Sequence, residues 1–192
     1  MTEIRTAKPE DAGRLLEIYD YYVTSTAVSL EYETPSLEEF TARMERTLKK
    51  YPYLVLVRDG KIEGYAYAGP FKGRASYAWS SEISIYLDHR AVKCGLGRML
   101  SEALEAELKK MGILNLYGCI AYPEKEDEYL TTNSADYHRH LGFETVGVFH
   151  RCACKFGRWY NMIWMEKLIG EHTDSVGDFV PFPDIRDELE IE

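Results

Sequence analysis

Two glycines and several basic side chains lie close together in one stretch of the sequence. Gly95 and Gly97 are one residue apart, and the stretch from residue 89 to 98 holds no acid and three bases, Arg90, Lys93 and Arg98. The first N–H groups of a helix lack intrahelical partners and attract anions. If a helix begins here, the pattern predicts a cradle for a polyphosphate. A solvated loop beside an acidic helix would give the same pattern, so both interpretations stay open.

The glycine pair fits neither of two common nucleotide-binding motifs. A dinucleotide-binding turn has a further glycine three residues after the second, but that position is Leu100 here. The phosphate loop of nucleoside triphosphatases has Lys and then Ser or Thr after its last glycine, whereas Arg98 and Met99 follow Gly97. Dinucleotide binding and nucleoside triphosphate chemistry are therefore not expected.

Composition predicts one globular domain with neither a nucleic-acid nor a membrane partner. The chain has 192 residues, of which 45% are hydrophobic, which suffices for one buried core. Its formal net charge of −9 opposes binding to nucleic acid or anionic lipid, since both need basic patches. The sequence shows neither an apolar run approaching the roughly 20 residues of a membrane span nor an N-terminal secretory signal. We therefore expect a soluble, cytoplasmic protein.

The cysteines raise the question of a metal site. The chain has four cysteines without a paired framework, which favours reduced thiols. His150, Cys152 and Cys154 alternate, so on a regular strand they would share one face and could suggest zinc. A fourth ligand is not evident and the spacing is not that of a zinc finger, so no metal is expected.

The spacing of apolar residues predicts the elements that must position the glycine turn. Helical spacing predicts helices over residues 9–23, 37–48, 96–111 and 135–142, the second preceded by a Ser36 and Glu39 capping box. Strand-forming runs cover residues 3–6, 53–69 with a turn at Asp59-Gly60, 75–87, 113–122, 143–153 and 158–168. This order predicts an α+β fold with a central mixed sheet.

Two acidic segments fall outside these elements. Residues 124–132 look like an inserted loop, and residues 170–192 form an acidic tail that is expected to be a partly ordered extension. We therefore expect a single domain over residues 1–169 and an extension over residues 170–192.

Antiparallel strands, a further strand, a glycine turn and a helix together resemble the GNAT family of acetyl-coenzyme A-dependent N-acetyltransferases. That family opens its helix with Q/R-x-x-G-x-G/A; Gly95 and Gly97 fit the motif, but Val92 stands at its first position. The resemblance implies a central mixed, mostly antiparallel, twisted sheet flanked by helices. It also implies that the pyrophosphate contacts Lys93, Cys94, Gly95, Leu96, Gly97 and Arg98, mainly through the backbone, with Lys93 or Arg90 supplying the missing charge.

A narrower resemblance covers residues 3–169. The runs IYDYYV, EGYAYAGPFKGRASYAW, SEISIYL, HLGF and KFGRWYNMIWMEKL resemble the phosphinothricin and methionine sulfoximine acetyltransferase group within GNAT. The sequence departs from that group at Leu30, at Val92 and in the insertion over residues 124–132. Leu30 and the insertion lie where the resemblance implies that the group binds its acceptor.

The resemblance assigns two catalytic residues. Acyl transfer from a thioester to an amine needs a base for the ammonium and an acid for the departing thiolate. Glu82, a carboxylate in an apolar and aromatic strand, matches the base, although an exposed strand acid would fit the alternation equally well. His138 matches the acid, and its unperturbed pKa near neutrality suits proton transfer. Tyr137 is the alternative acid, and a surface histidine is the alternative for His138.

The remaining site residues concern the pantetheine arm and the acceptor. The resemblance implies that Ile85, Tyr86 and Leu87 contact coenzyme A through their backbone. Asn133 either binds the pantetheine amides or caps its helix together with Ser134. Arg74 and Tyr77 are the candidates for binding an acceptor carboxylate, because a guanidinium can bind it in a bidentate way; Arg74 as a plain surface charge remains open.

These expectations combine into a direct transfer of acetyl to the amine of a small amino-acid-like acceptor, such as phosphinothricin or methionine sulfoximine, without a covalent enzyme intermediate. The alternatives are another amine, such as a polyamine, an aminoacyl conjugate or a protein N-terminus, and a coenzyme A sensor without turnover. A homodimer is expected from the family alone.

Overall fold

A computed structural model describes residues 1–91 and 95–185 of the chain. The chain divides into two compact units. The first comprises Met1–Ile18, Pro35–Leu116 and Leu168–Glu192, and the second comprises Tyr19–Thr34 and Tyr117–Lys167. The seven strands form a mixed sheet in the order β1-β2-β3-β4-β5-β7-β6, which confirms the predicted α+β class.

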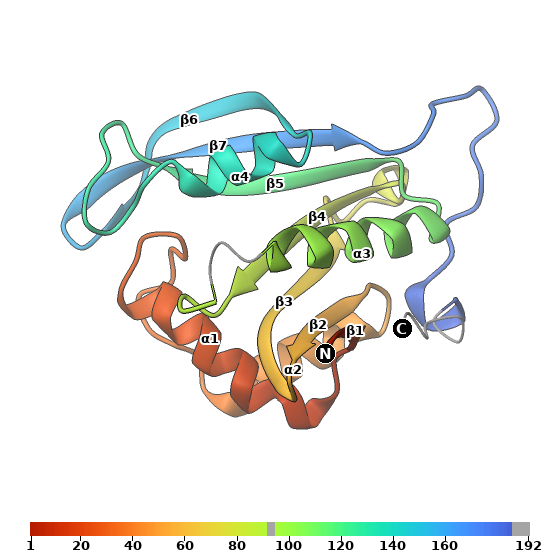
Figure 1. The fold of residues 1–192 in the computed structure, drawn as a ribbon. Helices are drawn as coiled ribbons and strands as arrows, with labels where there is room; N and C mark the ends of the chain where they lie inside the picture. Colours follow the sequence, from red (N-terminus) through yellow and green to blue (C-terminus); the bar gives the residue numbers. More distant parts are fainter. Residues whose placement is uncertain (92–94, 186–192) are drawn as a thin grey trace. The chain divides into compact units, whose positions relative to one another are not determined.

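The elements follow the predicted order along the chain (Figure 1). The strands are β1 (Thr2–Thr6), β2 (Tyr53–Arg58), β3 (Lys61–Pro70), β4 (Ser80–Leu87), β5 (Asn115–Tyr122), β6 (Glu144–Lys155) and β7 (Arg158–Leu168). The helices are α1 (Ala12–Thr24), α2 (Leu37–Leu48), α3 (Leu96–Lys110) and α4 (Asn133–His140). Short 3-10 turns are η1 (Pro9–Asp11), η2 (Ala75–Tyr77) and η3 (Phe182–Asp184). Among the helices described, none is long and apolar enough to cross a membrane.

Antiparallel pairing of β1 to β4 builds the sheet of the first unit. The turn between β2 and β3 lies at Asp59 and Gly60, whose φ angles of 52° and 78° confirm the predicted hairpin. Tyr53 lies opposite Tyr67, and their rings stack with centroids 4.8 Å apart. Tyr65 continues this row of rings and pairs with Tyr86 of β4. One face of the sheet is therefore lined by tyrosines.

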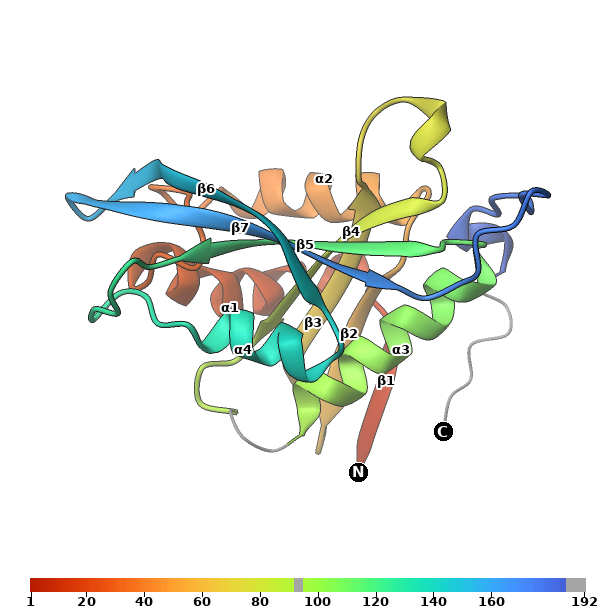
Figure 2. The same cartoon turned by 90° about the horizontal axis from the view of Figure 1, so that it is seen from above.

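Helices α2 and α3 cover opposite sides of β2 and β3 (Figure 1 and Figure 2). Helix α2 is capped by Ser36, whose Oγ accepts the Glu39 N–H at 3.1 Å as predicted. Phe40 brings α2 against the tyrosine face, since its ring centroid lies 6.3 Å from that of Tyr65. The buried stripe of α3 is also confirmed, in Leu100, Leu104 and Leu108.

The strand predicted over residues 75–87 is shorter in the structure. It begins only at Ser80, and η2 occupies the residues before Trp79. Trp79 marks the change because its carbonyl oxygen accepts the N–H groups of Leu114 at 2.8 Å and Asn115 at 3.1 Å. Residues 71–79 thus form a loop, named the β3–β4 loop below.

The described part of the acidic tail, residues 170–185, packs within the first unit. The N–H of Val180 donates to the Met111 carbonyl at 2.9 Å, and the N–H of Phe182 donates to that of Lys50 at 3.1 Å. The Phe182 side chain is completely buried. Apolar burial of this kind stabilises the tail's path despite its acidic composition.

The second unit contains the β6–β7 hairpin, which turns at Phe156 and Gly157 with φ angles of 51° and 72°. The pairing shifts between Phe149 and Ala153, and Arg151 adopts a φ of 48°. The Arg151 N–H donates to the side-chain oxygen of Asn161 at 2.8 Å instead of to the strand ladder.

This bulge breaks the alternation on which the zinc question depended. The pairing across His150, Cys152 and Cys154 is irregular, so the regular strand on which their predicted shared face depended is not present there. Over the described residues no three His, Cys, Asp or Glu side chains form a group that could hold a metal ion.

Candidate active site

Glu82 lies on β4 opposite Gly69 of β3. By strand alternation its side chain shares the tyrosine face with Ser84 and Tyr86, and the residue is half-buried. Burial raises the pKa of Glu82 above its ordinary value, while the charge of Lys72 opposes the rise. A carboxylate with a raised pKa is a better proton acceptor than an ordinary surface Glu, which favours the general base over the exposed strand acid.

The last three residues of β4 pair with β3, Ile85 with Ala66, Tyr86 with Tyr65 and Leu87 with Gly64. Gly64 is required by this approach, since a Cβ there would lie 2.4 Å from the Leu87 Cδ2 and 2.9 Å from the Tyr86 carbonyl oxygen. The end of β4 is thus held close to β3. The three residues predicted to contact coenzyme A through their backbone therefore lie on a firmly paired strand.

The glycine turn opens α3 as the sequence predicted. Gly95 is the N-cap residue with φ 76° and ψ −4°, a left-handed conformation that favours glycine. The first helical hydrogen bond runs from the Met99 N–H to the Gly95 carbonyl. The N–H groups of Leu96, Gly97 and Arg98 precede that bond, so they have no acceptor within the helix and can donate to a ligand. Lys93, Cys94 and the motif departure Val92 lie outside the described residues.

Asp88 holds the start of this basic stretch. Its carboxylate is only 2% exposed and accepts hydrogen bonds from the Arg14 guanidinium, from the Arg90 N–H at 2.9 Å and from the Arg90 Nε at 3.1 Å. Burial alone would raise the pKa of Asp88, but these hydrogen bonds lower it well below its usual range.

Asp88 directly precedes the acid-free stretch of residues 89–98, so the spacing of the bases did not point to it. Since Arg90 is paired with Asp88, its guanidinium already has an anionic partner. Arg90 is therefore a weaker candidate for the charge that Val92 does not supply.

Arg74 and Tyr77 both lie in the exposed β3–β4 loop. Tyr77 is 38% exposed and its ring meets Phe71 edge-on at 5.9 Å. In the part of the chain that the structure describes, no hydrogen bond or ion pair involves the guanidinium of Arg74. The loop therefore presents a cation that is available to an anion.

In the second unit, His138 is buried on α4. Its Nδ1 lies 2.8 Å from the Ser134 carbonyl oxygen, which can only accept a hydrogen bond, so Nδ1 carries the proton. Burial lowers the pKa of His138 below its ordinary value, against the effect of Ser134. A neutral ring with a proton on Nδ1 has an acceptor at Nε2. At neutral pH His138 therefore carries no proton on Nε2, and burial makes the charged, doubly protonated ring less favourable.

Gly118 of β5 lies beside the His138 ring, where a larger residue would crowd it. A Cβ at Gly118 would lie 3.3 Å from the ring Cδ2 and 3.4 Å from Nε2. The ring also meets Phe143 edge-on, with centroids 5.3 Å apart. The alternative of a surface histidine does not fit this buried environment.

Asn133 is the first residue of α4 and is exposed. The predicted helix cap by Asn133 and Ser134 is wrong, because the N-cap residue is Thr132 and its side chain makes no capping hydrogen bond. Thr132 Oγ1 donates instead to Glu126 of the acidic insertion at 3.0 Å.

Lys155 is a further residue of the second unit that the sequence analysis did not identify. It is 2% exposed, and its Nζ donates to the carbonyl oxygens of Val23 at 2.6 Å, Thr26 at 2.8 Å and Ser29 at 2.6 Å. Burial lowers the pKa of its ammonium, opposed by Glu31. The KFGRW run that contains Lys155 was noted as a resemblance, but the run does not reveal these partners.

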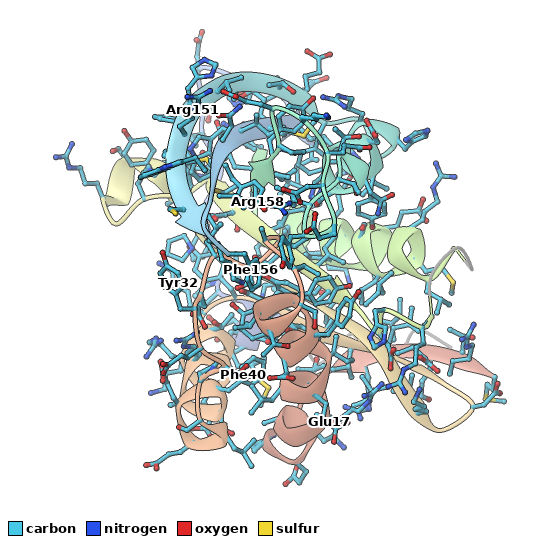
Figure 3. All side chains as sticks on the ribbon, turned by 90° about the vertical axis from the view of Figure 1, so that its left-hand side faces the viewer. Glu17, Tyr32, Phe40, Arg151, Phe156 and Arg158 are labelled. Carbon is cyan, nitrogen blue, oxygen red and sulfur yellow. The ribbon has the colours of Figure 1, made fainter. Side chains whose placement is uncertain are left out.

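Two further contacts join the same segments. Tyr32 Oη donates to the Cys154 carbonyl at 2.6 Å, and the Ala27 N–H donates to that of Tyr129 at 3.0 Å. Phe156, labelled with Tyr32 in Figure 3, stacks on Tyr129 with ring centroids 4.2 Å apart. The loop after α1, the acidic insertion and the β6–β7 turn therefore form one connected structure.

The predicted site residues thus fall into two groups. The first unit holds Glu82, the end of β4, the glycine turn and the β3–β4 loop, and the second holds Asn133 and His138. In the first unit, β4 carries the Glu82 carboxylate and ends at Leu87, directly before the basic stretch that leads to the glycine turn.

The fold is that of an acetyltransferase. A sequence model described as the acetyltransferase (GNAT) domain matches residues 4–164. The chain belongs to the GNAT family, and the expectation of an N-acetyltransferase is confirmed.

The narrower resemblance is confirmed by particular relatives. The phosphinothricin N-acetyltransferase of Streptomyces viridochromogenes is 29% identical over 160 residues, covering 83% of this chain and 84% of that protein. The L-methionine sulfoximine/L-methionine sulfone acetyltransferase of Salmonella typhimurium is 29% identical over 171 residues, covering 88% and 96%. The crystal structure of a phosphinothricin acetyltransferase from Sinorhizobium meliloti in complex with AcCoA has a TM-score of 0.83 and 28% identity, covering 94% and 98%.

Proposed function

We propose that the protein uses acetyl-coenzyme A to acetylate the amine of a small amino-acid acceptor of the phosphinothricin or methionine sulfoximine type. The observation that carries this proposal is the half-buried Glu82 carboxylate, whose pKa burial raises, on the strand that leads to the glycine turn. Relatives with those named activities cover most of the chain and support the acceptor class.

The residues at the glycine turn fit acetyl-coenzyme A. Gly95 places no side chain over the start of α3, and the first-turn N–H groups can bind the pyrophosphate. Arg98 adds a positive charge, although its Nε lies 3.7 Å from the Glu102 carboxylate. The site therefore binds phosphate mainly through the backbone.

Glu82 acts as the general base in this proposal. It removes one proton from the acceptor ammonium, directly or through one water, so that the nitrogen becomes a nucleophile. Bound acetyl-coenzyme A supplies a thioester: the amine forms the C–N bond, the C–S bond breaks, and the second nitrogen proton goes to the sulfur. His138 remains the resemblance-based candidate for a proton-transfer role, and its Nε2 acceptor suits it to relaying a proton.

Arg74 binds the acceptor carboxylate in this proposal. A guanidinium donates two parallel hydrogen bonds to a carboxylate, and Tyr77 on the same loop offers a ring and a hydroxyl. This explains why the acceptor would be an amino acid rather than a polyamine, which has no carboxylate. We also propose that the protein works as a homodimer in the cytoplasm, in keeping with the expectation from the family and the sequence.

Release of free coenzyme A thiol tests the proposal against a panel of amines. Turnover with phosphinothricin or methionine sulfoximine, but not with their decarboxylated analogues, is the expected result. Turnover only with polyamines, aminoacyl conjugates or peptide N-termini would overturn the acceptor class. Tight binding of acetyl-coenzyme A without turnover of any amine would favour a sensor.

A further inference from the structure

We propose that the C-terminal segment, residues 169–185, positions the β3–β4 loop by holding the indole of Trp79. This inference rests on the proposed function, because it concerns the loop that carries Arg74 and Tyr77. It assigns a role in acceptor binding to a segment beyond residue 164, where the match to the GNAT domain ends.

Trp79 is the last residue of the β3–β4 loop and is held on two sides. Its indole Nε1–H donates to the Gly177 carbonyl oxygen at 2.7 Å. Its own carbonyl oxygen accepts the N–H groups of Leu114 and Asn115 at the start of β5. The backbone of Trp79 is thus fixed by the sheet, while its side chain is fixed by the C-terminal segment.

The C-terminal segment can serve as an anchor because it is pinned before and after Gly177. The Ile169 N–H donates to the Leu114 carbonyl at 2.8 Å, and the Val180 N–H donates to that of Met111 at 2.9 Å. Beyond these, Phe182 is completely buried.

Side-chain contacts hold the same segment at Phe179. Its ring lies 6.0 Å from that of Tyr51, and the Lys50 Nζ lies 4.8 Å from its centroid. Gly112 makes room for the path, since a Cβ there would lie 2.5 Å from the Asp178 carbonyl oxygen.

The outer part of the β3–β4 loop faces solvent, and the contact between the rings of Tyr77 and Phe71 lies within the loop itself. Residues 72–77 are all exposed, and at the base the Phe71 N–H donates to the Ser80 carbonyl at a long 3.4 Å. The indole contact ties the last residue of the loop to a segment outside the loop, and so limits the motion of the loop. Fixing a binding loop before the ligand arrives lowers the entropic cost of binding.

The variant Trp79→Phe tests the inference, because an aromatic ring remains while the indole N–H is lost together with the five-membered ring that carries it. We expect the KM for the amino-acid acceptor to rise about 5-fold or more, since an unrestrained loop must be ordered by the ligand. We expect the KM for acetyl-coenzyme A to stay within about 2-fold. Hydrogen exchange of the amides in residues 71–79 should become faster in the variant without any ligand.

Trp159→Phe is the matched control, since Trp159 lies on β7 and is 63% exposed. It should change neither KM nor exchange in residues 71–79. A second variant, Phe179→Ala, loosens the C-terminal segment without touching Trp79 and should reproduce both effects of Trp79→Phe.

The outcomes separate this inference from the proposed function. If wild-type protein acetylates the acceptor and Trp79→Phe changes neither its KM nor the exchange of the loop, the inference is wrong. Equal rises in both KM values would also overturn it, because they would indicate a general loss of structure. If wild-type protein acetylates no amino acid, the proposed function fails, and the exchange experiment alone still decides whether the C-terminal segment restrains the loop.

Discussion

The Nζ of Lys155 lies 2.6 Å from the carbonyl oxygen of Val23, next to the C-terminal end of α1. Together with the carbonyls of Thr26 and Ser29, this contact uses all three N–H groups of the ammonium. A buried cation with every donor paired acts as a fixed cross-link between the β6–β7 turn and the loop after α1.

Lys155→Met should therefore destabilise the protein, because it keeps an apolar stem but leaves buried carbonyls without donors. We expect a loss of at least about 2 kcal/mol in the free energy of unfolding, measured by urea denaturation at neutral pH. Lys125→Met, which changes an exposed lysine of the same unit, should change it by less than about 0.5 kcal/mol. Equal stabilities of the two variants would show that the ammonium is not a cross-link.

Glu82→Gln should lower kcat by about 100-fold or more at neutral pH, because the amide cannot accept the proton. In the wild type, kcat/KM should fall as acidification protonates Glu82. Burial raises the pKa of this carboxyl, so the fall should begin at a higher pH than for an ordinary Glu. The variant should lack this limb of the pH profile. Glu3→Gln, which removes an exposed carboxylate from β1, should leave the profile unchanged; a retained limb in Glu82→Gln would reassign the base.

Asp88→Asn should destabilise the first unit by about 3 kcal/mol at neutral pH, since it leaves the Arg14 guanidinium without its buried partner. The effect should depend on pH with a definite sign. The folded-state pKa of Asp88 lies below its usual range. Its stabilisation is therefore complete above the unfolded value near 3.8 and declines as the pH falls toward the folded value.

Urea denaturation at pH 7 and at decreasing acid pH checks this, and the gap between wild type and Asp88→Asn should narrow on acidification. Glu17→Gln is the control, because Glu17 also pairs with Arg14 but is 69% exposed. It should cost no more than about 1 kcal/mol. A gap for Asp88→Asn that stays constant down to the acid limit would contradict the ion cluster.

Gly118→Ala should disturb His138, because the added Cβ falls within 3.4 Å of its ring. The imidazole must shift, which weakens the Nδ1 bond to Ser134. NMR titration of the histidine signals, assigned with His138→Gln, should show a changed pKa for His138. A steady-state assay of Gly118→Ala should show a lower kcat. Gly147→Ala, with no neighbour within 4 Å of its Cβ, should change neither. An unchanged titration curve in Gly118→Ala would show that the ring has spare room.

Local signals explain what the sequence could predict. The Ser36 cap, the Asp59-Gly60 hairpin and the apolar stripe of α3 each depend on residues within a few positions of one another. The glycine turn belongs to the same class, because a left-handed residue before a helix is a local requirement.

The features that were missed depend on distant partners. Asp88 binds Arg14 from 74 positions away, and Lys155 reaches Val23 from 132 positions away. The bulge at Arg151 follows from its bond to Asn161, and Trp79 ends a loop because β5 binds its carbonyl. Periodicity describes which face of an element is apolar, but it does not say which distant segment will cover that face.

The buried Phe182 has a practical consequence for where this protein ends as a folding unit. The match to the GNAT domain model ends at residue 164, yet Phe182, whose side chain is completely buried, lies well beyond it. A recombinant protein cut at the family boundary would expose the ends of α2 and α3, where Lys50 and Met111 now bind the last segment. Truncation before Phe182 should therefore lower solubility, whereas an affinity tag placed after Ile185 should leave the contacts of this segment with Lys50 and Met111 intact.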